Sequence, residues 1–213
     1  MLTSTKTKNN HINTDNHNIF PNMTKTNIAI FASGSGTNCE NIIRYFANHD
    51  SICVTVVLCN KADAGALERA KRLGVPAIYL NKEGFNSHQQ MSALLSQYDV
   101  NFIVLAGFLL MVPDFLIKEF HHRMINIHPA LLPKYGGKGM YGHHVHEAVC
   151  KAGEKETGFT VHWVSEVCDG GEIIAQMKTA LTSDDPPETI AAKEHVLEMD
   201  HFPRIIEEII HSL

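Results

Sequence analysis

The feature that most constrains the fold is a run of eight residues, Ile-Cys-Val-Thr-Val-Val-Leu-Cys at positions 52–59, in which apolar and β-branched side chains follow one another without regular alternation. A strand of this kind is buried on both faces, which is typical of parallel sheets covered by helices. Similar runs occur at residues 27–32 and 100–106. The sequence therefore predicts an α/β domain with a mostly parallel central sheet flanked by helices.

Strand and helix signals alternate along the chain, as in βαβ units. The last helix is predicted over residues 190–213, with an interruption at Pro203 because proline donates no backbone hydrogen bond. The length of 213 residues suits a single domain, predicted over residues 27–213. The other helices are expected near residues 40–46, 64–73, 87–97, 114–120 and 143–151, and the other strands near residues 76–80, 123–128, 160–164 and 172–180.

Residues 1–26 differ from the rest, because they are rich in Asn, Thr and Lys and have hardly an apolar residue before Ile19. This composition predicts a disordered tail without the features of a secretory or transit leader. The chain has no run of about 18 apolar residues, so no spanning helix is expected. Five cysteines without a C-x-x-C motif favour reduced thiols and a cytoplasmic location.

The formal net charge of −5 gives no general attraction to nucleic acid or to an anionic membrane. Any phosphate group must therefore be bound by a local site. The 14 histidines raise the question of a metal, and they gather at residues 121–122 and 143–146. Neither group has an H-E-x-x-H motif or an adjacent pair of thiols, so we expect no metal.

The candidate chemistry begins at residues 124–129, Met-Ile-Asn-Ile-His-Pro. Side chains two apart on a strand share a face, so Asn126 and His128 are expected to point the same way where Pro129 ends the strand. An amide can stabilise an oxyanion and an imidazole can move a proton, which together suit acyl transfer to an amine. A buried polar pair at the end of a core strand is the alternative.

A small-residue cluster, Ser-Gly-Ser-Gly-Thr-Asn at residues 33–38, joins the first strand to a helix. Glycines and free N–H groups at a helix start can bind a phosphate, and Thr37 and Asn38 can add side-chain donors. A plain tight turn is the alternative. Cys39 stands where a dinucleotide fingerprint needs its third glycine, and a P-loop would need Gly-Lys-Ser/Thr.

Three further features of the sequence could contribute to a functional site. Leu109, Leu110, Met111 and Val112 form an apolar segment after strand 100–106, which fits the wall of a pocket for a flat ligand but also fits buried packing. Asp169 precedes two glycines and can be a turn residue alone. On the last helix His195 and Glu198 share one face.

Four segments occur in a characteristic order: Ser-Gly-Ser-Gly-Thr-Asn at 33–38, Val-Leu-Ala-Gly-Phe at 104–108, Asn-Ile-His-Pro-Ala-Leu-Leu-Pro-Lys-Tyr at 126–135 and Asp-Gly-Gly at 169–171. Together they closely resemble the glycinamide ribonucleotide formyltransferase family, over about residues 27–211. The family implies a Rossmann-like fold and transfer of the formyl group of 10-formyltetrahydrofolate, a cosubstrate, to the amine of glycinamide ribonucleotide. The products are formylglycinamide ribonucleotide and tetrahydrofolate, in de novo purine biosynthesis.

The resemblance also implies roles for residues at matching positions. It implies small-molecule substrates and a monomer or homodimer, without metal, nucleic acid or membrane. The implied catalytic residues are Asn126, His128 and Asp169; the implied phosphate turn is Gly36, Thr37 and Asn38, with His195 nearby and Glu198 on the ribose; and the implied folate wall is Leu109, Leu110, Met111 and Val112, with Asp169 and the backbone before it at the polar edge.

This sequence departs from the family pattern in three places. Leu110 stands where many relatives carry Arg, so help for the anionic folate tail is missing or comes from elsewhere. The loop after Tyr135 is longer than the common form. His195 replaces a Gln or Lys, which predicts a more pH-dependent affinity for phosphate.

The implied reaction passes through a tetrahedral intermediate with an oxyanion and a protonated amine, so the site needs a donor and a proton route. If Asp169 lies beside His128, its charge is expected to keep His128 partly protonated. Transfer to methionyl-tRNA, to an amino-sugar nucleotide or to water is an alternative, although the acidic charge and single domain disfavour tRNA. A nucleotide sensor without catalysis should lack one of the three catalytic residues, and a serine hydrolase needs G-x-S-x-G.

Overall fold

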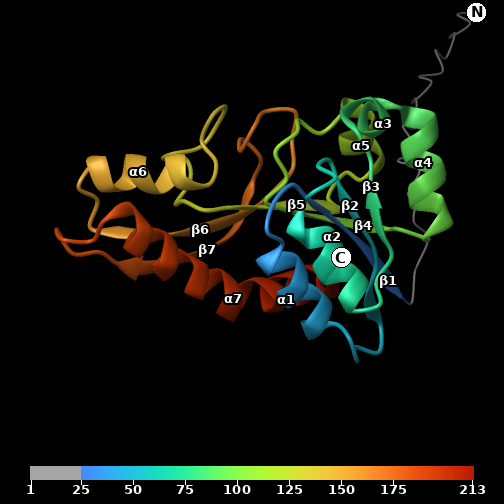
Figure 1. Ribbon diagram of the computed structural model, residues 1–213, viewed down its shortest axis with the longest axis horizontal. Helices are drawn as coiled ribbons and strands as arrows, with labels where there is room; N and C mark the ends of the chain where they lie inside the picture. Colours follow the sequence, from blue (N-terminus) through green and yellow to red (C-terminus); the bar gives the residue numbers. More distant parts are fainter. Residues whose placement is uncertain (1–24) are drawn as a thin grey trace, which may run out of the picture.

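The computed structural model describes residues 25–213, in which seven strands form one sheet in the order β3-β2-β1-β4-β5-β6-β7 (Figure 1). Neighbours from β3 to β5 are parallel, and β6 and β7 are added antiparallel. The predicted mostly parallel sheet is confirmed. The strands are β1 (Thr26–Ala32), β2 (Ile52–Cys59), β3 (Ala77–Tyr79), β4 (Phe102–Ala106), β5 (Met124–His128), β6 (Glu156–Trp163) and β7 (Ile173–Ala180).

Seven helices within residues 25–213 cover the sheet (Figure 1). Helices α1, α2 and α7 pack on one face and α3, α4 and α5 on the other, while α6 packs with part of α7 beside β6 and β7. The helices are α1 (Thr37–Tyr45), α2 (Gly65–Arg72), α3 (Lys82–Asn86), α4 (His88–Gln97), α5 (Asp114–Glu119), α6 (His143–Lys151) and α7 (Pro187–His211).

Successive residues of β1 serve two separate cores, which explains its unbroken apolar run. Ile28 and Ile30 pack with α1, α2 and α7, whereas Ala29 and Phe31 pack with α3, α4 and α5. All four side chains are completely buried. A strand between two helical layers needs apolar residues on both faces. The inference of a covered parallel sheet from residues 52–59 rests on the same physical requirement.

The expected break at Pro203 is wrong, because α7 runs through it as one helix. Proline cannot donate to the carbonyl group four residues earlier, which leaves the oxygen of Met199 without its helical partner. The side-chain amide of Asn41 on α1 donates to that oxygen at 2.8 Å. Pro203 itself is buried in the core. A side chain from another helix therefore replaces the missing hydrogen bond.

Several element bounds differ from those expected. Helix α1 begins three residues earlier than predicted, and β6 begins at Glu156 rather than near residue 160. Residue 158, inside β6, must be glycine, because a Cβ atom there would lie 1.8 Å from the Met177 carbonyl oxygen on β7. The short helix α3 was not expected; the Asn81 side chain caps it by accepting from the Gly84 N–H.

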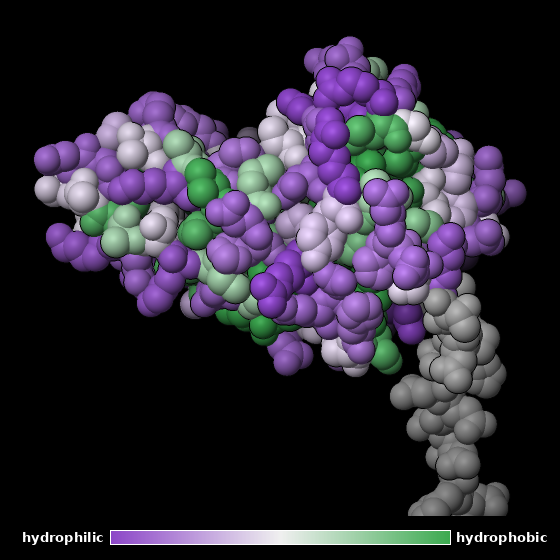
Figure 2. All heavy atoms as spheres, turned by 90° about the horizontal axis from the view of Figure 1, so that it is seen from below, coloured by the Kyte–Doolittle hydropathy of each residue, from purple (hydrophilic) through white to green (hydrophobic). Residues whose placement is uncertain are grey.

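The predicted tail lies outside the described residues except for its last two positions. Of these, Thr26 already pairs with Ile52 at the start of β1, so the domain begins slightly earlier than residue 27. No helix within residues 25–213 combines the length and apolarity needed to cross a bilayer. On the face seen in Figure 2, hydrophilic residues predominate and the apolar ones form separate patches.

The strand order creates a place for ligands between β1 and β4. The chain builds β2 and β3 on one side of β1 and then returns to place β4 on the other side. At such a switch point the loops after two neighbouring strands part, and ligands bind in the crevice between them. Ser33 joins the two loops, since its N–H donates to the Gly107 carbonyl oxygen at 3.0 Å and its hydroxyl accepts from the Leu109 N–H at 2.8 Å.

Candidate active site

The three predicted catalytic residues converge at the carboxyl end of β5. Asn126 and His128 lie on β5, and Asp169 lies in the turn between β6 and β7. A cavity of about 70 Å³ is lined by Asn126 and Asp169 together with His162. His128 is only 3% exposed and is not among the residues that line this cavity. The structure thus brings together the three polar side chains that the sequence predicts to act together.

The two ring nitrogens of His128 face different oxygen atoms. Nε2 lies 2.8 Å from the Tyr135 carbonyl oxygen, which can only accept, so Nε2 carries a proton. Nδ1 lies 3.5 Å from Oδ2 of Asp169. Burial lowers the pKa of His128, and the Asp169 charge and the Tyr135 carbonyl, which raise it, do not offset that effect. His128 is therefore less protonated at neutral pH than expected from the sequence.

Asp169 accepts a backbone N–H and faces the rings of two histidines. Its Oδ2 accepts from the Gly137 N–H at 2.9 Å, and its Oδ1 lies 3.7 Å from Nε2 of His162. Burial raises the pKa of Asp169, but contacts with His162, His128 and Gly137 together lower it below its usual value. Its φ of 53° is left-handed, a conformation that Asp and Asn tolerate. Asp169 is therefore both a turn residue and a buried carboxylate.

His162 is a site residue that the sequence reading did not assign. It pairs with Asn126 across β5 and β6, and Nδ2 of Asn126 lies 3.0 Å from its Nε2. Its Nδ1 faces the Trp163 carbonyl oxygen at 2.9 Å and must donate, so Nε2 accepts from Asn126. Asn126 also donates to Oδ1 of Asp169 at a longer 3.4 Å. Antiparallel pairing of residues 160–164 with β5 was the signal that could have found it.

The apolar loop after β4 forms part of the cavity wall. Leu110, Met111 and Val112 line it, but Leu109 does not; its N–H instead anchors the loop to Ser33. Met111 is 60% exposed. An apolar wall facing polar groups from β5 and β6 suits a flat aromatic ligand with hydrogen-bonding edges. The residues present therefore fit a folate ring.

The glycine-rich turn after β1 leads directly into α1. Gly36 has a φ of +78°, and a Cβ atom there would lie 2.4 Å from Cα of Ala66, so both conformation and space require glycine. The first N–H groups of α1, including those of Thr37 and Asn38, lack partners within the helix. Arg69 donates to the Ser35 carbonyl oxygen at 2.9 Å and braces the turn. The turn can therefore accept an anion.

The predicted phosphate and ribose residues meet although they lie far apart in sequence. Nδ2 of Asn38 donates to Oε2 of Glu198 at 2.8 Å, and Nδ1 of His195 lies 3.3 Å from the same oxygen. The hydrogen bond with Glu198 raises the pKa of His195. The contact joins the start of α1 to α7, which lie side by side in Figure 1.

A larger cavity of about 420 Å³ lies on the other side of the segment after β5. Leu131, Leu132, Pro133 and Tyr135 form one wall, and Thr157 and Gln176 lie opposite. None of the three predicted catalytic residues lines it. Its two lysines and two glutamates pair with one another, Lys134 with Glu154 and Lys178 with Glu156, so it offers no unpaired charge to a ligand. The chemistry favours the smaller cavity as the active site.

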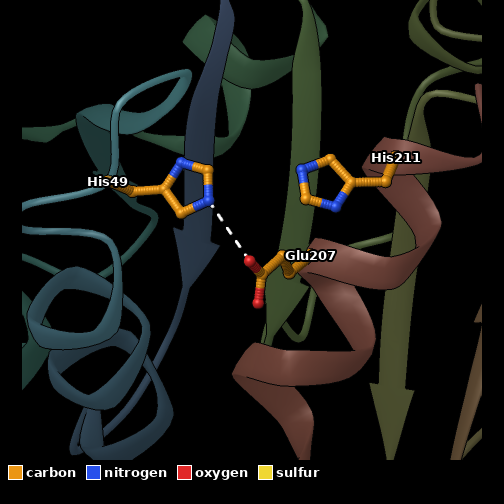
Figure 3. Close-up of side chains that lie close together, drawn as sticks. All are labelled: His49, Glu207 and His211. Carbon is orange, nitrogen blue, oxygen red and sulfur yellow. Dashed lines mark hydrogen bonds and ion pairs between the residues drawn. The ribbon is translucent and has the colours of Figure 1, made fainter.

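One group within residues 25–213 has the composition of a metal site: His49, Glu207 and His211 (Figure 3). However, Nδ1 of His49 accepts from the backbone N–H groups of Ser51 and Ile52 at 3.2 and 3.0 Å, so it is unprotonated. Neutral His49 then carries its proton on Nε2, which donates to Glu207 at 3.2 Å. A metal would need the Nε2 lone pair. The cluster therefore anchors the end of α7.

Comparisons with known proteins all find formyltransferases. A model of the formyl transferase family matches residues 26–206. The chain is 38% identical over 195 residues to the chloroplastic phosphoribosylglycinamide formyltransferase of Arabidopsis thaliana, with 86% of this chain covered. It is 34% identical over 185 residues to the phosphoribosylglycinamide formyltransferase of Haemophilus influenzae, with 84% of this chain and 85% of that protein covered.

Solved structures agree in fold. The phosphoribosylglycinamide formyltransferase of Anaplasma phagocytophilum matches with a TM-score of 0.80 and 29% identity over 88% of each chain. That of Bacillus halodurans matches with a TM-score of 0.77 and 33% identity, covering 87% of this chain and 95% of the other. The chain spans 66% of the Arabidopsis relative and 60% of a second plant relative, from Vigna unguiculata.

Proposed function

The chain belongs to the formyl transferase family, and we propose that it transfers the formyl group of 10-formyltetrahydrofolate to the amine of glycinamide ribonucleotide. The products are formylglycinamide ribonucleotide and tetrahydrofolate, in de novo purine biosynthesis. The observation that carries the proposal is the meeting of Asn126, His128 and Asp169 beside an apolar loop. The anion-binding turn of α1, joined to Glu198, supplies a ribonucleotide site.

Asn126 is proposed to stabilise the oxyanion that forms when the amine attacks the formyl carbon. Its side-chain amide makes a 3.0 Å contact with His162 and a longer 3.4 Å contact with Asp169. The longer contact is the weaker one, so it is the one exchanged for the developing oxyanion. His162 keeps the amide oriented throughout the exchange. His162 thereby positions the donor without touching the reacting atoms.

His128 and Asp169 are proposed to carry the proton from the attacking amine toward the leaving nitrogen. Mostly neutral His128 presents its unprotonated Nδ1 toward Oδ2 of Asp169, 3.5 Å away. A proton accepted at this pair is shared between nitrogen and carboxylate, while the Tyr135 carbonyl holds the ring in place. Asp169 stabilises the imidazolium formed and orients it. The pair thus works as a base first and as an acid afterwards.

The two substrates are proposed to bind at neighbouring places along the carboxyl edge of the sheet. Gly36, Thr37 and Asn38 take the 5′-phosphate, with His195 adding a cationic partner, and Glu198 takes the ribose hydroxyls. The folate ring lies against Leu110, Met111 and Val112. A cavity of about 70 Å³ is small beside the ~300 Å³ or more of ordinary ligand pockets, so the exposed side chains of Met111 and Val167 must move aside.

A spectrophotometric assay tests the function directly. The full chain is mixed with 10-formyltetrahydrofolate and glycinamide ribonucleotide, and folate absorbance reports loss of the formyl group. We expect turnover that requires both substrates. Matched reactions replace the ribonucleotide with an amino-sugar nucleotide, with methionyl-tRNA or with buffer alone. Faster turnover in any of these than with glycinamide ribonucleotide contradicts the assignment.

The remaining assignments concern the state in which the enzyme works. We propose that it acts in the cytoplasm as a monomer or homodimer, on small molecules, without a metal, nucleic acid or membrane. The net charge of −5 supports the absence of nucleic acid, and the hydrogen bonding of His49 supports the absence of a metal at the cluster in Figure 3. Light scattering and metal analysis of the active protein test these assignments.

A further inference from the structure

The ribonucleotide side of the site contains a buried acid, Glu194, that the proposed reaction does not use. It lies one turn before Glu198 on α7, and the two residues are 3% and 8% exposed. Residues four apart on a helix occupy the same face, so the two buried carboxyl groups are neighbours on α7. Acidic side chains are seldom buried to this extent unless they have partners. A buried pair of this kind therefore requires hydrogen bonds or an opposite charge.

The carboxyl groups of Glu194 and Glu198 differ in their hydrogen-bond and ion-pair partners. Oε2 of Glu198 accepts from Asn38 and lies near His195. Within residues 25–213 Glu194 forms no ion pair, and its Oε1 is buried without a hydrogen-bond partner. Lys193, its neighbour in sequence, is paired with Asp185 at 2.6 Å. The charge of Glu198 thus has two partners, whereas a charge on Glu194 would have none.

The other elements packed against the pair do not supply the missing positive charge. His146 on α6 is 6% exposed, and its Nδ1 is buried without a partner. Burial lowers the pKa of His146, although the charge of Glu198 acts in the opposite direction, and His143 on the same helix lowers it further. Asn38 on α1 contributes an amide, which carries no charge. His195 is the one basic side chain in contact with the pair among the described residues.

Two neighbouring carboxyl groups with one exposed imidazole as partner cannot both be ionised without strong repulsion. One of them keeps its proton and donates it to the other in a hydrogen bond. Burial raises the pKa of Glu194 well above its usual value, and the charge of Glu198 adds to the effect. The proton therefore belongs on Glu194. Asn38 and His195 are already directed at Oε2 of Glu198.

We propose that Glu194 is a positioning residue for the ribonucleotide: its O–H donates to the Glu198 carboxylate and fixes that side chain for the ribose hydroxyls. The inference rests on the proposed function. Loss of this proton would set two negative charges side by side and displace Glu198. The affinity for the ribonucleotide should then fall as the pH rises, whereas folate binding and the chemical step, which lie at the end of β5, should be unaffected.

Two variants at this position separate hydrogen bonding from charge. Glu194→Gln keeps a donor of nearly the same shape but has no proton to lose, and Glu194→Leu removes the donor with little change in size. Turnover and KM for each substrate are measured from about pH 6 to about pH 9. For the Leu variant we expect the KM for the ribonucleotide to rise about tenfold, with kcat and the folate KM unchanged, the scale of one charge-assisted hydrogen bond.

The Gln variant tests whether a neutral donor at position 194 is enough to maintain ribonucleotide binding. We expect it to keep the wild-type KM at neutral pH and to lose the rise in ribonucleotide KM that the wild type shows at alkaline pH. The inference is overturned if the ribonucleotide KM is unchanged in the Leu variant. It is also overturned if the Gln variant shows the same alkaline rise in ribonucleotide KM as the wild type. If the Leu variant does not fold, the pH profile of the Gln variant decides alone. Absence of wild-type turnover with glycinamide ribonucleotide overturns the proposed function instead, and this inference with it.

Discussion

At the scale of single residues, the balance of forces on His128 is the most informative feature. Its Nε2 is committed to the Tyr135 carbonyl, and its Nδ1 faces Asp169. Burial disfavours the imidazolium and the carboxylate favours it, and burial has the larger effect. In the proposed reaction, such a histidine accepts a proton from the attacking amine and gains a stabilising partner once it is protonated.

His128→Ala is expected to lower turnover by roughly a hundredfold or more, the usual scale for a positioned acid or base. The fold should survive, because the β5 backbone keeps its pairing with β4 and β6. Steady-state kinetics and a thermal melt check both statements. His121→Ala is the control, since that exposed ring stacks on His122 away from the cavity. Near wild-type turnover in the His128 variant would remove it from the mechanism.

Asp169→Asn tests whether this residue does more than shape a turn. Asn tolerates the left-handed φ and can still accept from the Gly137 N–H, so the fold should be kept. The charge that raises the pKa of His128 is lost, so that pKa should fall further. The limb of the pH–rate profile due to His128 should shift to lower pH, with severely reduced turnover. An unchanged profile would leave Asp169 as a turn residue.

At the scale of elements, the contact between α1 and α7 forms the proposed ribonucleotide site. Asn38→Ala removes a side-chain donor at the phosphate turn and the 2.8 Å hydrogen bond to Glu198. The apparent KM for the ribonucleotide should therefore rise far more than the KM for the folate, whose wall comes from other loops. Initial rates with each substrate varied in turn measure both values. Equal increases would argue against the turn as a phosphate site.

The continuity of α7 through Pro203 gives a stability prediction. Asn41→Ala removes the side-chain donor to the Met199 carbonyl oxygen, and should lower the free energy of unfolding by about 1 kcal/mol. In a Pro203→Ala background the restored N–H can bond to that oxygen, so the same change should have a smaller effect. Urea unfolding of the four proteins completes the cycle. Equal effects in both backgrounds would contradict the compensation.

The sequence predicted those parts of the fold and site that depend on local patterns. Buried strands, the glycine turn and the Asn126–His128 spacing each arise within a few residues. His162, Asn41 and Glu194 were missed because their roles depend on partners brought close by tertiary packing. His162 acquires its role through the register of β6 on β5, and Asn41 through the packing of α1 on α7.

At the scale of the whole molecule, both proposed binding places lie along the carboxyl edge of one sheet. The turn after β1 and the loop after β4 flank the switch point, and α7 returns to the same edge from the end of the chain. The ribonucleotide would thus join segments that are 160 residues apart in sequence. A ligand bound across such segments stabilises the folded state as a whole, because the unfolded chain cannot present both at once.

Glycinamide ribonucleotide alone should therefore raise the melting temperature of the protein. At a hundredfold excess over its dissociation constant, mass action predicts about 2.7 kcal/mol of stabilisation. For a domain of this size that corresponds to a rise of about 5 to 10 °C in Tm. Calorimetric melts with and without the ribonucleotide measure the shift. The rise should be much smaller in Asn38→Ala, which weakens the link between α1 and α7, and should be kept in Asp169→Asn, which alters the reaction centre on the other side of the switch point. The reverse result, with the shift lost in Asp169→Asn and kept in Asn38→Ala, would place the ribonucleotide at the reaction centre and away from the turn.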